Sequence, residues 1–423
     1  MKERLFFCVD LGTSSLKAAL IDNTGSLHFF VRIPFINADT SVPYLNAFYS
    51  AADQLAGAWD AAGRALPVAA LIISGSGPTL IPVKGKDRHS SESMRPIYWN
   101  DPLIPLEKTT MKNNFSENYF SLFLPRLKAF MDANPSSIAG ISYFFSPQEW
   151  LSWKLGADPV TVIPHDGYIP YYWDDIQCSR LGIDINCFPP FVNMGSIIGE
   201  LNSFVSAQGG LAAKLLLPGI PIIAGAADFI MALIGTGTLE PGKACDRTGS
   251  SEGINICVSH RPAPIPGASG AASGLRILPH AVPGLWNIGA HIPKSGLLFE
   301  QYRSETGQEE KSYDELVQEI FTNASHPGKA VLEKICDSFI NALDNLEAAG
   351  QVIKELTLSG GQCAEDLWNQ YKADRSRKVL LLPEIIHTEL TGNAILGECI
   401  FSSNSIKEIA AEMIHIQKRY YPV

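Results

Sequence analysis

Two short segments of the same design place the strongest limit on the fold of this chain. Residues 5–22 read as a buried strand, a turn of small residues at 12–15 and a second strand that runs back. Residues 243–258 repeat this order around a turn of Thr, Gly and Ser at 248–251. Because one such hairpin begins each half of the chain, we expect a duplicated architecture with a cleft between the two halves.

Strand patterns alternate with helix patterns in both halves. The expected strands lie, besides the hairpins, within residues 66–83, 356–361 and 378–385. Three helices are expected. One begins at a capping box at 146–149, and the other two cover residues 331–346 and 405–418. This alternation predicts an α/β protein.

The length of the chain, 423 residues, predicts two domains. A single hydrophobic core rarely grows beyond roughly 250–300 residues. With 46% hydrophobic residues, each half can bury a core of its own. We expect an N-terminal domain of residues 1–222 and a C-terminal domain of residues 223–423.

Charge and cysteine usage exclude several classes of protein. The net charge of −10 argues against a surface that binds nucleic acid or an anionic membrane, although backbone N–H groups can still bind phosphates locally. The eight cysteines are scattered without a CxxC pair, which favours free thiols in the cytoplasm over a zinc site or disulfides. The N-terminal apolar run is too short for a signal peptide, and prolines interrupt the apolar run at 214–240, so we expect a soluble protein.

The first hairpin carries the residue types of a phosphate site. Asp10 ends a buried strand, and Gly12, Thr13 and Ser14 follow in a turn rich in N–H and hydroxyl donors, with Lys17 beyond it. Such a turn can surround a phosphate, because no bulky side chain intervenes. The Asp10 carboxylate can then hold Mg²⁺, directly or through water. The alternative is an ordinary hairpin with an aspartate at the end of a strand.

Asp228 is the only charged residue between Lys214 and Glu240, in an apolar, Gly-rich run. Burial without a partner raises the pKa of a carboxyl group, and a general base that accepts a proton from an alcohol needs such proton affinity. The alternative role is a helix N-cap, since apolar residues follow Asp228 directly. The two roles are compatible.

Two later turns have the composition of nucleotide-binding turns. Gly249, Ser250 and Ser251 form a second candidate phosphate turn, and Gly360 and Gly361 follow an expected strand, where a flat nucleoside can lie. A plain turn is the alternative for the glycine pair. The evidence for a nucleotide site therefore comes from the order of all these segments along the chain.

This order resembles the FGGY family of ATP-dependent carbohydrate kinases, within the superfamily of actin-like and sugar-kinase ATPases. The resemblance covers most of the chain. The segments that carry it are DLGTSSLKAALID at 10–22, RPIYWND at 95–101, SPQEWLSWKLGAD at 146–158, PIIAGAADFIMALIGTGTLEPGKA at 221–244, SGGQCAEDLWNQYKAD at 359–374 and ELTGNA at 389–394.

The resemblance implies two ribonuclease-H-like (actin-like ATPase) domains that face each other across a central cleft. It implies transfer of the γ-phosphate of ATP, with Mg²⁺ near Asp10, to a hydroxyl of a small sugar or polyol, and it makes Asp228 the general base. Both phosphate turns would hold the phosphates, and Gly360, Gly361 and Gly296 the adenosine. The residues implied to bind the substrate are Ser76, Gly77, Thr79, Trp99, Asn100, Asp101 and Asp228. Family members often form homodimers, so a homodimer is an expectation from the resemblance alone.

Several features depart from the family pattern. Xylulose-type kinases have a Met-His pair where this chain has residues 76–79, and the arginine that normally follows the WND motif is absent after Asp101. A glycine- and aromatic-rich block of the second domain is missing near residues 316–331. Asn393 stands where the family has alanine, and Arg247 precedes the second phosphate turn.

These departures leave a second hypothesis beside the active kinase, namely a catalytically weakened homologue that binds nucleotide or sugar. A third hypothesis, an actin-like or chaperone-like ATPase that acts on proteins, is disfavoured by the RPIYWND segment and by Asp228. Both features suit a small hydroxylated substrate better than a protein.

Overall fold

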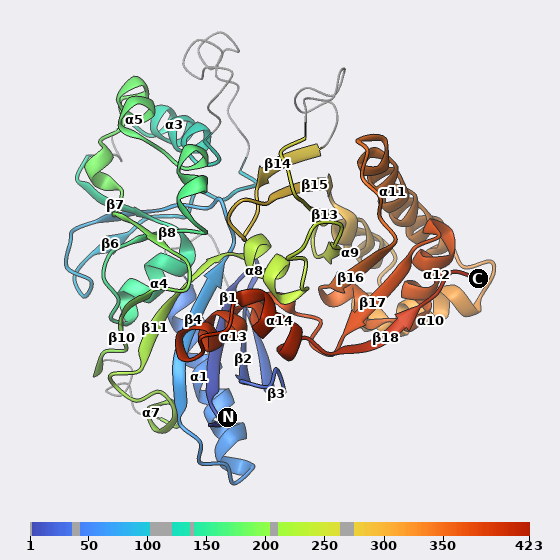
Figure 1. Ribbon diagram of the computed structural model, residues 1–423, viewed down its shortest axis with the longest axis horizontal. Coiled ribbons are helices and arrows are strands. Elements are labelled where there is room, and N and C mark those ends of the chain that lie inside the picture. Colours follow the sequence, from blue (N-terminus) through green and yellow to red (C-terminus); the bar gives the residue numbers. More distant parts are fainter. Residues whose placement is uncertain (1, 36–42, 102–120, 136–138, 204–209, 263–274) are drawn as a thin grey trace. The chain divides into compact units, whose positions relative to one another are not determined.

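The computed structural model describes residues 2–35, 43–101, 121–135, 139–203, 210–262 and 275–423. The chain divides into two compact units, which are described separately (Figure 1). Unit 1 comprises Met1–Met231 and Asn393–Ile409, and unit 2 comprises Ala232–Gly392 and Ala410–Val423. The first part of unit 1 ends at Met231, nine residues after the expected boundary at 222. The return of residues 393–409 to unit 1 is not part of the sequence-based expectation.

Unit 1 is built from mixed sheets and helices. Its strands are β1 (Leu5–Leu11), β2 (Ser15–Asp22), β3 (Leu27–Pro34), β4 (Val68–Gly75), β5 (Ile81–Lys84), β6 (Glu92–Ser93), β7 (Ile141–Phe145), β8 (Thr161–Ile163), β9 (Phe191–Asn193), β10 (Ile197–Glu200) and β11 (Pro221–Ala227). Its helices are α1 (Tyr44–Ala61), α3 (Leu124–Ala133), α4 (Pro147–Leu155), α5 (Asp175–Leu181) and α7 (Ala212–Leu215).

Unit 2 has the same mixed character. Its strands are β12 (Ala244–Thr248), β13 (Glu252–Val258), β14 (Leu275–Pro279), β15 (Trp286–Ile292), β16 (Glu355–Ser359), β17 (Val379–Pro383) and β18 (Ile416–Tyr420). Its helices are α9 (Ser295–Glu305), α10 (Tyr313–Thr322), α11 (Lys329–Ala348) and α12 (Asp366–Ser376). Three further helices each contribute residues to both units, namely α8 (Asp228–Gly235), α13 (Thr388–Phe401) and α14 (Ile406–Met413).

The main sheet of unit 1 has six strands in the order β10-β11-β4-β1-β2-β3. β1, β2 and β3 form an antiparallel meander, whereas β4 and β11 run parallel to β1 and β4 respectively. All seven residues of β1 are buried, as expected for a central strand with both faces covered. On one face, α1 and α4 contribute Phe48 and Trp150 to the core. On the other face α13 approaches closely, because a methyl group on Gly397 would meet the Phe6 ring at 2.8 Å.

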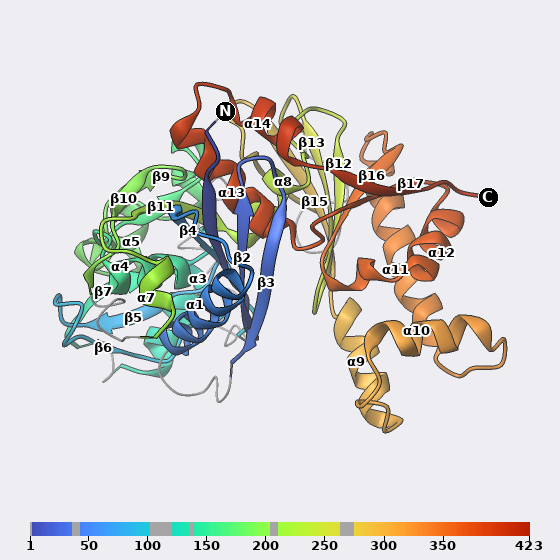
Figure 2. The same cartoon turned by 90° about the horizontal axis from the view of Figure 1, so that it is seen from below.

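The sheet of unit 2 has seven strands in the order β14-β15-β13-β12-β16-β17-β18 (Figure 2). β12, β13 and β15 form an antiparallel meander, and β16 and β17 continue the sheet in parallel. Five neighbouring strands therefore have the same order and directions in both units, namely β3-β2-β1-β4-β11 in unit 1 and β15-β13-β12-β16-β17 in unit 2. This repeat confirms the duplicated α/β architecture that the two hairpins predict.

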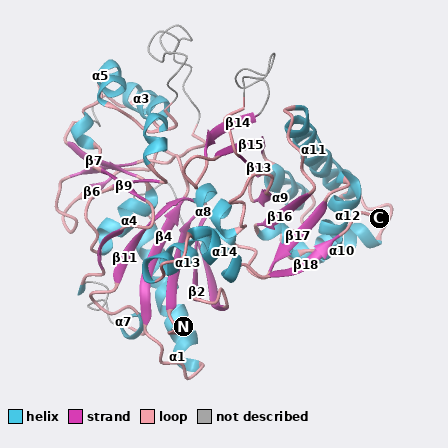
Figure 3. Cartoon of the chain, in the orientation of Figure 1, coloured by secondary structure: helices cyan, strands magenta, loops and turns pink. Residues whose placement is uncertain are grey.

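A long connection between β4 and β10 forms the remainder of unit 1. It contains a three-stranded sheet in the order β6-β5-β7, a two-stranded pairing of β8 with β9, and the helices α3, α4 and α5 (Figure 3). This connection carries residues 95–101, which the sequence assigns to substrate binding.

The expected local elements are mostly confirmed. α4 begins with the predicted capping box, in which the Ser146 N–H donates to Glu149 Oε2 at 2.7 Å. The helix expected at 331–346 is α11. The helix expected at 405–418 is wrong in its last part, because α14 ends at Met413 and β18 follows. Pairing of β18 with β17 satisfies backbone groups that a longer helix would satisfy internally, and this long-range pairing decides the local structure.

Candidate functional site

The carboxyl ends of three neighbouring parallel strands bring the predicted residues of unit 1 together. In the register of β1 with β4, Asp10 lies opposite Ser74 and Leu11 opposite Gly75. In the register of β4 with β11, Gly75 lies opposite Ala227, the residue before Asp228. Ligands of open α/β sheets bind at this edge. The register therefore places Asp10, the turn after β4 and Asp228 at one edge of one sheet.

Asp10 is buried and accepts hydrogen bonds on both carboxylate oxygens. Ser74 Oγ donates to Oδ1 at 3.1 Å, and Lys17 Nζ lies 3.2 Å from Oδ2. Lys17 is directly opposite Asp10 in the β1–β2 hairpin, so the antiparallel register forms this ion pair. Its side chain remains 20% exposed, compared with 2% for Asp10. The pair therefore has one closed side, against Ser74, and one side that reaches solvent at the lysine.

Asn393 supports Asp10 indirectly, through hydrogen bonds to its neighbours Val9 and Ser74. Its side chain is fully buried, and Nδ2 donates to the Val9 carbonyl at 2.8 Å and to Ser74 Oγ at 3.0 Å. Asn393 belongs to the part of α13 that returns to unit 1. Asn393, which stands where the family has alanine, therefore positions the Ser74 hydroxyl that donates to Asp10. Sequence reasoning identified the mismatch but not this role.

Trp99 joins two of the predicted segments. Its backbone N–H donates to Thr79 Oγ1 at 3.3 Å, and its indole Nε1 donates to Thr13 Oγ1 at 3.1 Å. Thr79 is fully buried, so its hydroxyl serves this contact. The turn expected to bind phosphate and the segment expected to bind substrate are therefore tied together by one indole.

Ser76 and Gly77 lie at the end of β4, beside the first hairpin. The Ser76 N–H donates to the Leu11 carbonyl at 2.8 Å. The Ser76 hydroxyl is buried and has no hydrogen-bond partner among the described residues. A methyl group on Gly77 would meet Ala227 Cβ at 2.9 Å, so the turn packs directly against the residue before Asp228. A buried hydroxyl of this kind is available to a ligand, because leaving it unpaired is unfavourable.

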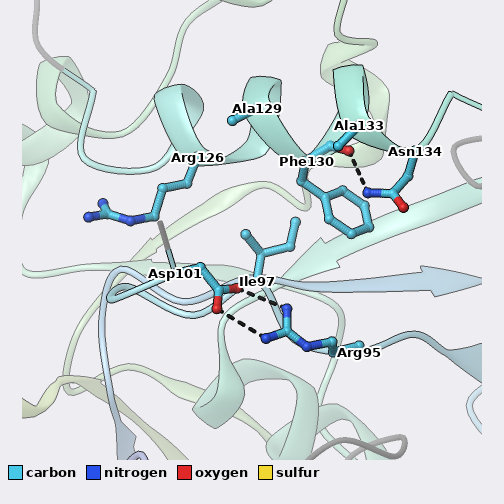
Figure 4. Close-up of a pocket in the computed structure, with 8 residues that line it drawn as sticks. All are labelled: Arg95, Ile97, Asp101, Arg126, Ala129, Phe130, Ala133 and Asn134. Atoms are coloured by element: carbon cyan, nitrogen blue, oxygen red, sulfur yellow. Dashed lines mark hydrogen bonds and ion pairs between the residues drawn. The ribbon is translucent and has the colours of Figure 1, made fainter. Parts of the chain in front are cut away.

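Asp101 is held in an ion pair, whereas Asn100 is exposed. The Arg95 guanidinium donates to Asp101 Oδ2 and Oδ1 at 3.0 and 3.1 Å, and the Tyr98 N–H donates to Oδ2 at 3.0 Å. Arg95 and Asp101 lie in the wall of a pocket of about 220 Å³ in unit 1 (Figure 4). Residues of α3, including Arg126 and Phe130, form the other wall. The guanidinium that bonds Asp101 therefore comes from the start of the RPIYWND segment.

Asp228 is the first residue of α8 and is half-buried. Its Oδ1 accepts a hydrogen bond from the Phe229 N–H at 2.6 Å. This contact is not that of the N-cap considered from the sequence, because an N-cap accepts from the N–H two or three residues further on. Because Asp228 directly follows β11, its carboxylate lies at the same edge of the sheet as Asp10.

In unit 2, the two predicted turns and the start of α9 converge around the tip of the second hairpin. Thr248 Oγ1 donates to the Ser359 carbonyl at 2.8 Å, at the end of β16. A side chain at Gly360, whose φ is +97°, would meet the Thr248 carbonyl oxygen at 1.8 Å, and one at Gly296 would meet the Gly249 carbonyl oxygen at 2.1 Å. Glycine is thus required at both positions by close backbone approach.

The rest of this turn is open. Gly249 and Ser250 are exposed, Ser251 is half-buried, and a side chain at Gly361 would meet no atom within 4 Å. Gln362, which sequence reasoning did not single out, donates from Nε2 to the Gly249 carbonyl at 3.1 Å. The turn of the second hairpin, the glycine pair and the start of α9 therefore form one continuous surface of small residues.

A buried ionic cluster lies beneath this surface. Lys372 of α12 bonds the carboxylates of Asp246 and Glu252, with Nζ 2.6 Å from Glu252 Oε1, and Ser295 Oγ donates to Glu252 Oε2 at 2.7 Å. The three ionisable side chains are at most 1% exposed. Burial, followed by the charge of Glu252, raises the pKa of Asp246 to about 8. The cluster connects β12, β13, α12 and the start of α9, and sequence reasoning missed it.

Two further observations bear on the sequence-based expectations. Across the described ranges, no helix combines the length and apolar character needed to cross a membrane. Nor do three or more His, Cys, Asp or Glu side chains gather there in a way that could hold a metal ion. Mg²⁺ in nucleotide sites is usually bound by one or two carboxylates together with phosphates and water. A lone Asp10 carboxylate beside a phosphate turn fits that chemistry.

Comparison with known proteins shows that the chain is similar to sugar kinases. Residues 272–399 match the model of the FGGY family of carbohydrate kinases, C-terminal domain. Xylulose kinase of Bacillus subtilis (strain 168) is 21% identical over 393 residues, which span 77% of this chain and 74% of that protein.

Solved structures of sugar kinases share the fold. Ligand-bound xylulose kinase from Lactobacillus acidophilus has a TM-score of 0.77 at 15% identity, covering 99% of this chain and 94% of that one. Gluconate kinase from the same organism has a TM-score of 0.77 at 16% identity, covering 100% and 94%. Plasmodium falciparum glycerol kinase with ADP has a TM-score of 0.74 at 13% identity, covering 99% and 94%. Residues 272–399 thus match the C-terminal domain of the FGGY family, and the likeness to solved structures shows that the chain has the two-domain actin-like ATPase fold of these sugar kinases.

Proposed function

We propose that the chain is an ATP-dependent carbohydrate kinase that transfers the γ-phosphate of ATP to a hydroxyl of a small sugar or polyol. The observation that carries the proposal is the shared sheet edge of unit 1. There, the register of β1, β4 and β11 gathers a carboxylate suited to Mg²⁺, a turn suited to phosphate and a second carboxylate at Asp228. Phosphoryl transfer depends mainly on positioning and charge neutralisation, which such an edge supplies.

Asp228 is the proposed general base. Its Oδ1 accepts from the Phe229 N–H, which fixes the carboxylate at the start of α8. The second oxygen can accept the proton of a substrate hydroxyl as that hydroxyl attacks phosphorus. Proton transfer by a positioned side chain typically contributes about 10²–10⁴-fold to the rate.

The first hairpin of unit 1 and the second hairpin of unit 2 are the proposed phosphate turns. Thr13 and Lys17 in one, and Gly249 and Ser250 in the other, offer hydroxyl, ammonium and backbone N–H donors. Bound Mg²⁺ would neutralise phosphate charge, and Asp10 would hold it directly or through water. The surface around Gly360 and Gly361 is the proposed adenosine platform.

Substrate recognition is assigned to the end of β4 and the segment that follows. The unpaired, buried Ser76 hydroxyl and the Trp99 ring are suited to a sugar, since one offers a polar contact and the other an apolar ring face. Asp101 is assigned a supporting role, because its ion pair with Arg95 satisfies both of its oxygens.

The test is ADP release from MgATP with a panel of ketoses, aldoses, pentitols and glycerol, comparing the wild type with Asp228→Asn. Asparagine has the size of aspartate and keeps an oxygen that can accept from the Phe229 N–H. The variant should therefore fold and bind nucleotide, but its turnover should fall about 10²–10⁴-fold. Asp174→Asn is the control for the same exchange elsewhere in unit 1, at an aspartate that caps α5 by accepting from the Gln177 N–H at 2.7 Å.

Undiminished turnover in Asp228→Asn would remove that residue from the role of base. No sugar-stimulated turnover across the panel, with nucleotide still bound in calorimetry, would favour the alternative of a weakened homologue that binds nucleotide or sugar.

A further inference from the structure

The sheet of unit 2 has two chemically different faces. Along β13 and β15, the apolar residues Ile254, Ile256 and Ile288 point into the core beneath α11. The residues between them are Gly253 and Asn255 on β13 and Gly289 and His291 on β15, and alternation places them on the opposite face. That second face contains no large apolar side chain at these four positions.

The register of four strands assembles two rows of residues on this second face. Arg247 of β12 lies opposite Gly253, which lies opposite His291 of β15. In the next row, Asn255 lies opposite Gly289, which lies opposite Arg276 of β14. Each glycine therefore separates two larger polar residues. We call Arg247, Arg276 and His291, with the glycine floor between them, the cationic face.

The floor has room for a ligand atom. A methyl group on Gly253 would meet nothing closer than 3.8 Å, and one of the atoms at that distance is Arg247 Nη2. Gly253 has an ordinary backbone conformation, so glycine is not required there by its dihedral angles. Because Gly253 has no side chain, the centre of the cationic face is a shallow depression in the sheet surface.

The guanidiniums of Arg247 and Arg276 act on each other and on His291, and within the described ranges neither arginine forms an ion pair. Burial and the charge of Arg247 lower the pKa of Arg276, and burial and the charges of both arginines lower the pKa of His291. No ion pair within the described ranges joins Arg247 or Arg276 to a carboxylate. The buried Arg247 Nε also has no hydrogen-bond partner among the described residues. Such a group needs an acceptor.

We propose that the cationic face binds the oxyanion group, a carboxylate or a phosphate, of a small molecule. Guanidinium groups bind both anions with two parallel N–H···O bonds. Two guanidiniums around a low floor can approach one anion from two sides, and His291 adds a third donor.

The position of Arg247 in the sequence limits which molecule can supply the anion. Arg247 directly precedes Thr248 and Gly249 of the second phosphate turn. The anion is therefore either the phosphate tail of the nucleotide or an acidic group on the substrate, which would make the substrate a sugar acid or sugar phosphate. This choice of source rests on the proposed kinase function, whereas the existence of the anion site does not.

The test measures binding by calorimetry with the full chain and three probes: pyrophosphate, D-gluconate and the matched neutral polyol D-sorbitol. Arg276→Gln and Arg247→Gln each remove one charge, and Gly253→Val fills the floor without changing charge. Arg375→Gln is the control, because Arg375 is an exposed cation of the same unit on α12, paired with Asp337. Thermal unfolding of each variant verifies that it is folded.

At least one anion should bind the wild type, and its affinity should fall about tenfold or more in each of the three test variants, since a hydrogen bond to a charged group is lost or blocked. Arg375→Gln should not change it, and sorbitol binding should be the same in all variants. Loss confined to pyrophosphate identifies the nucleotide tail, and loss confined to gluconate identifies an acidic substrate.

Three results would overturn the proposal: no binding of either anion to the wild type, equal affinity in the test variants, or an equal loss in Arg375→Gln. Because the readout is binding, failure of the proposed kinase activity leaves this test intact, and the reverse also holds.

Discussion

The two units share one strand order, yet they stabilise corresponding hairpins with different ionic arrangements. In unit 1, one carboxylate, Asp10, faces one ammonium, Lys17, and the lysine remains 20% exposed. In unit 2, two carboxylates, Asp246 and Glu252, share one lysine, and all three side chains are at most 1% exposed. The first arrangement is charge-balanced and partly open. The second is closed and carries one carboxylate in excess.

The difference fits the proposed roles, a ligand-facing site in unit 1 and an internal support in unit 2. A partly open aspartate–lysine pair can exchange its contacts for those of a phosphate or a metal ion at little cost, because water already reaches the lysine. A fully buried cluster cannot, since each charge depends on its partners for the solvation it has lost. At its proposed phosphate turn, unit 2 therefore presents backbone and hydroxyl groups and keeps the cluster of Asp246, Glu252 and Lys372 underneath.

Removal of the buried lysine should have the largest effect. Lys372→Met leaves two carboxylates inside unit 2 without a cation, and breaking a buried ion pair in this way typically costs about 3–5 kcal/mol. Urea unfolding should show this loss. Hydrogen exchange should place it in unit 2, with faster exchange in β12 and β13 and unchanged protection in β1 and β2.

A triple variant tests whether charge is the cause. Lys372→Met combined with Asp246→Leu and Glu252→Gln removes the lysine together with both negative charges and keeps an acceptor for Ser295. Its stability should return close to that of the wild type, because buried ion pairs replaced by well-packed neutral groups are often neutral or stabilising. A triple variant as unstable as the single one would show instead that the lysine acts through packing, since Nζ lies 3.9 Å from the centre of the Phe339 ring.

The excess carboxylate predicts a pH dependence confined to unit 2. The pKa of Asp246 is about 8 in the folded protein, above its ordinary value of 3.8, so the folded state retains a proton that the unfolded state releases between these values. This contribution to stability is complete below pH 3.8 and is lost as the pH rises through about 8. Over pH 5 to 7.5, the wild type should lose about 1 kcal/mol per pH unit relative to Asp246→Asn. Parallel curves for the two proteins would mean that Asp246 is ionised throughout.

The two hairpins could be predicted from the sequence, because the patterns that indicate them are local. A strand pattern, a turn of small residues and a second strand predict β1–β2 and β12–β13 without knowledge of any distant residue. The same holds for Gly360, whose place after an expected strand indicates a tight turn. The predicted substrate and nucleotide roles of these residues stay predictions.

The contacts of Lys372 and Asn393 could not be predicted from the sequence, because the residues that they join are far apart in it. Lys372 is 126 residues from Asp246 and 120 from Glu252, and Asn393 is 384 residues from Val9. No periodicity links such positions. Asn393 stood out only as a departure from a family pattern, and Lys372 reads in the sequence as one more lysine of a helix. Only the register of the strands and the packing of α12 and α13 show what these residues contact.

The smallest change in stability is expected at the open pair of unit 1. Lys17→Met removes one donor from Asp10, but Ser74 still donates to that carboxylate and water can reach it from the side of the lost ammonium. The cost should be about 1–2 kcal/mol, the range of a single hydrogen bond to a charged group. Turnover with MgATP, by contrast, should fall clearly, since the ammonium is assigned to the phosphates. Lys17→Arg is the matched control, because it keeps the charge and should retain more turnover than Lys17→Met at similar stability. If Lys17→Met were instead as destabilising as Lys372→Met and had normal turnover when folded, the two hairpins would be supported in the same way, and the distinction between an open functional pair and a closed structural cluster would fail.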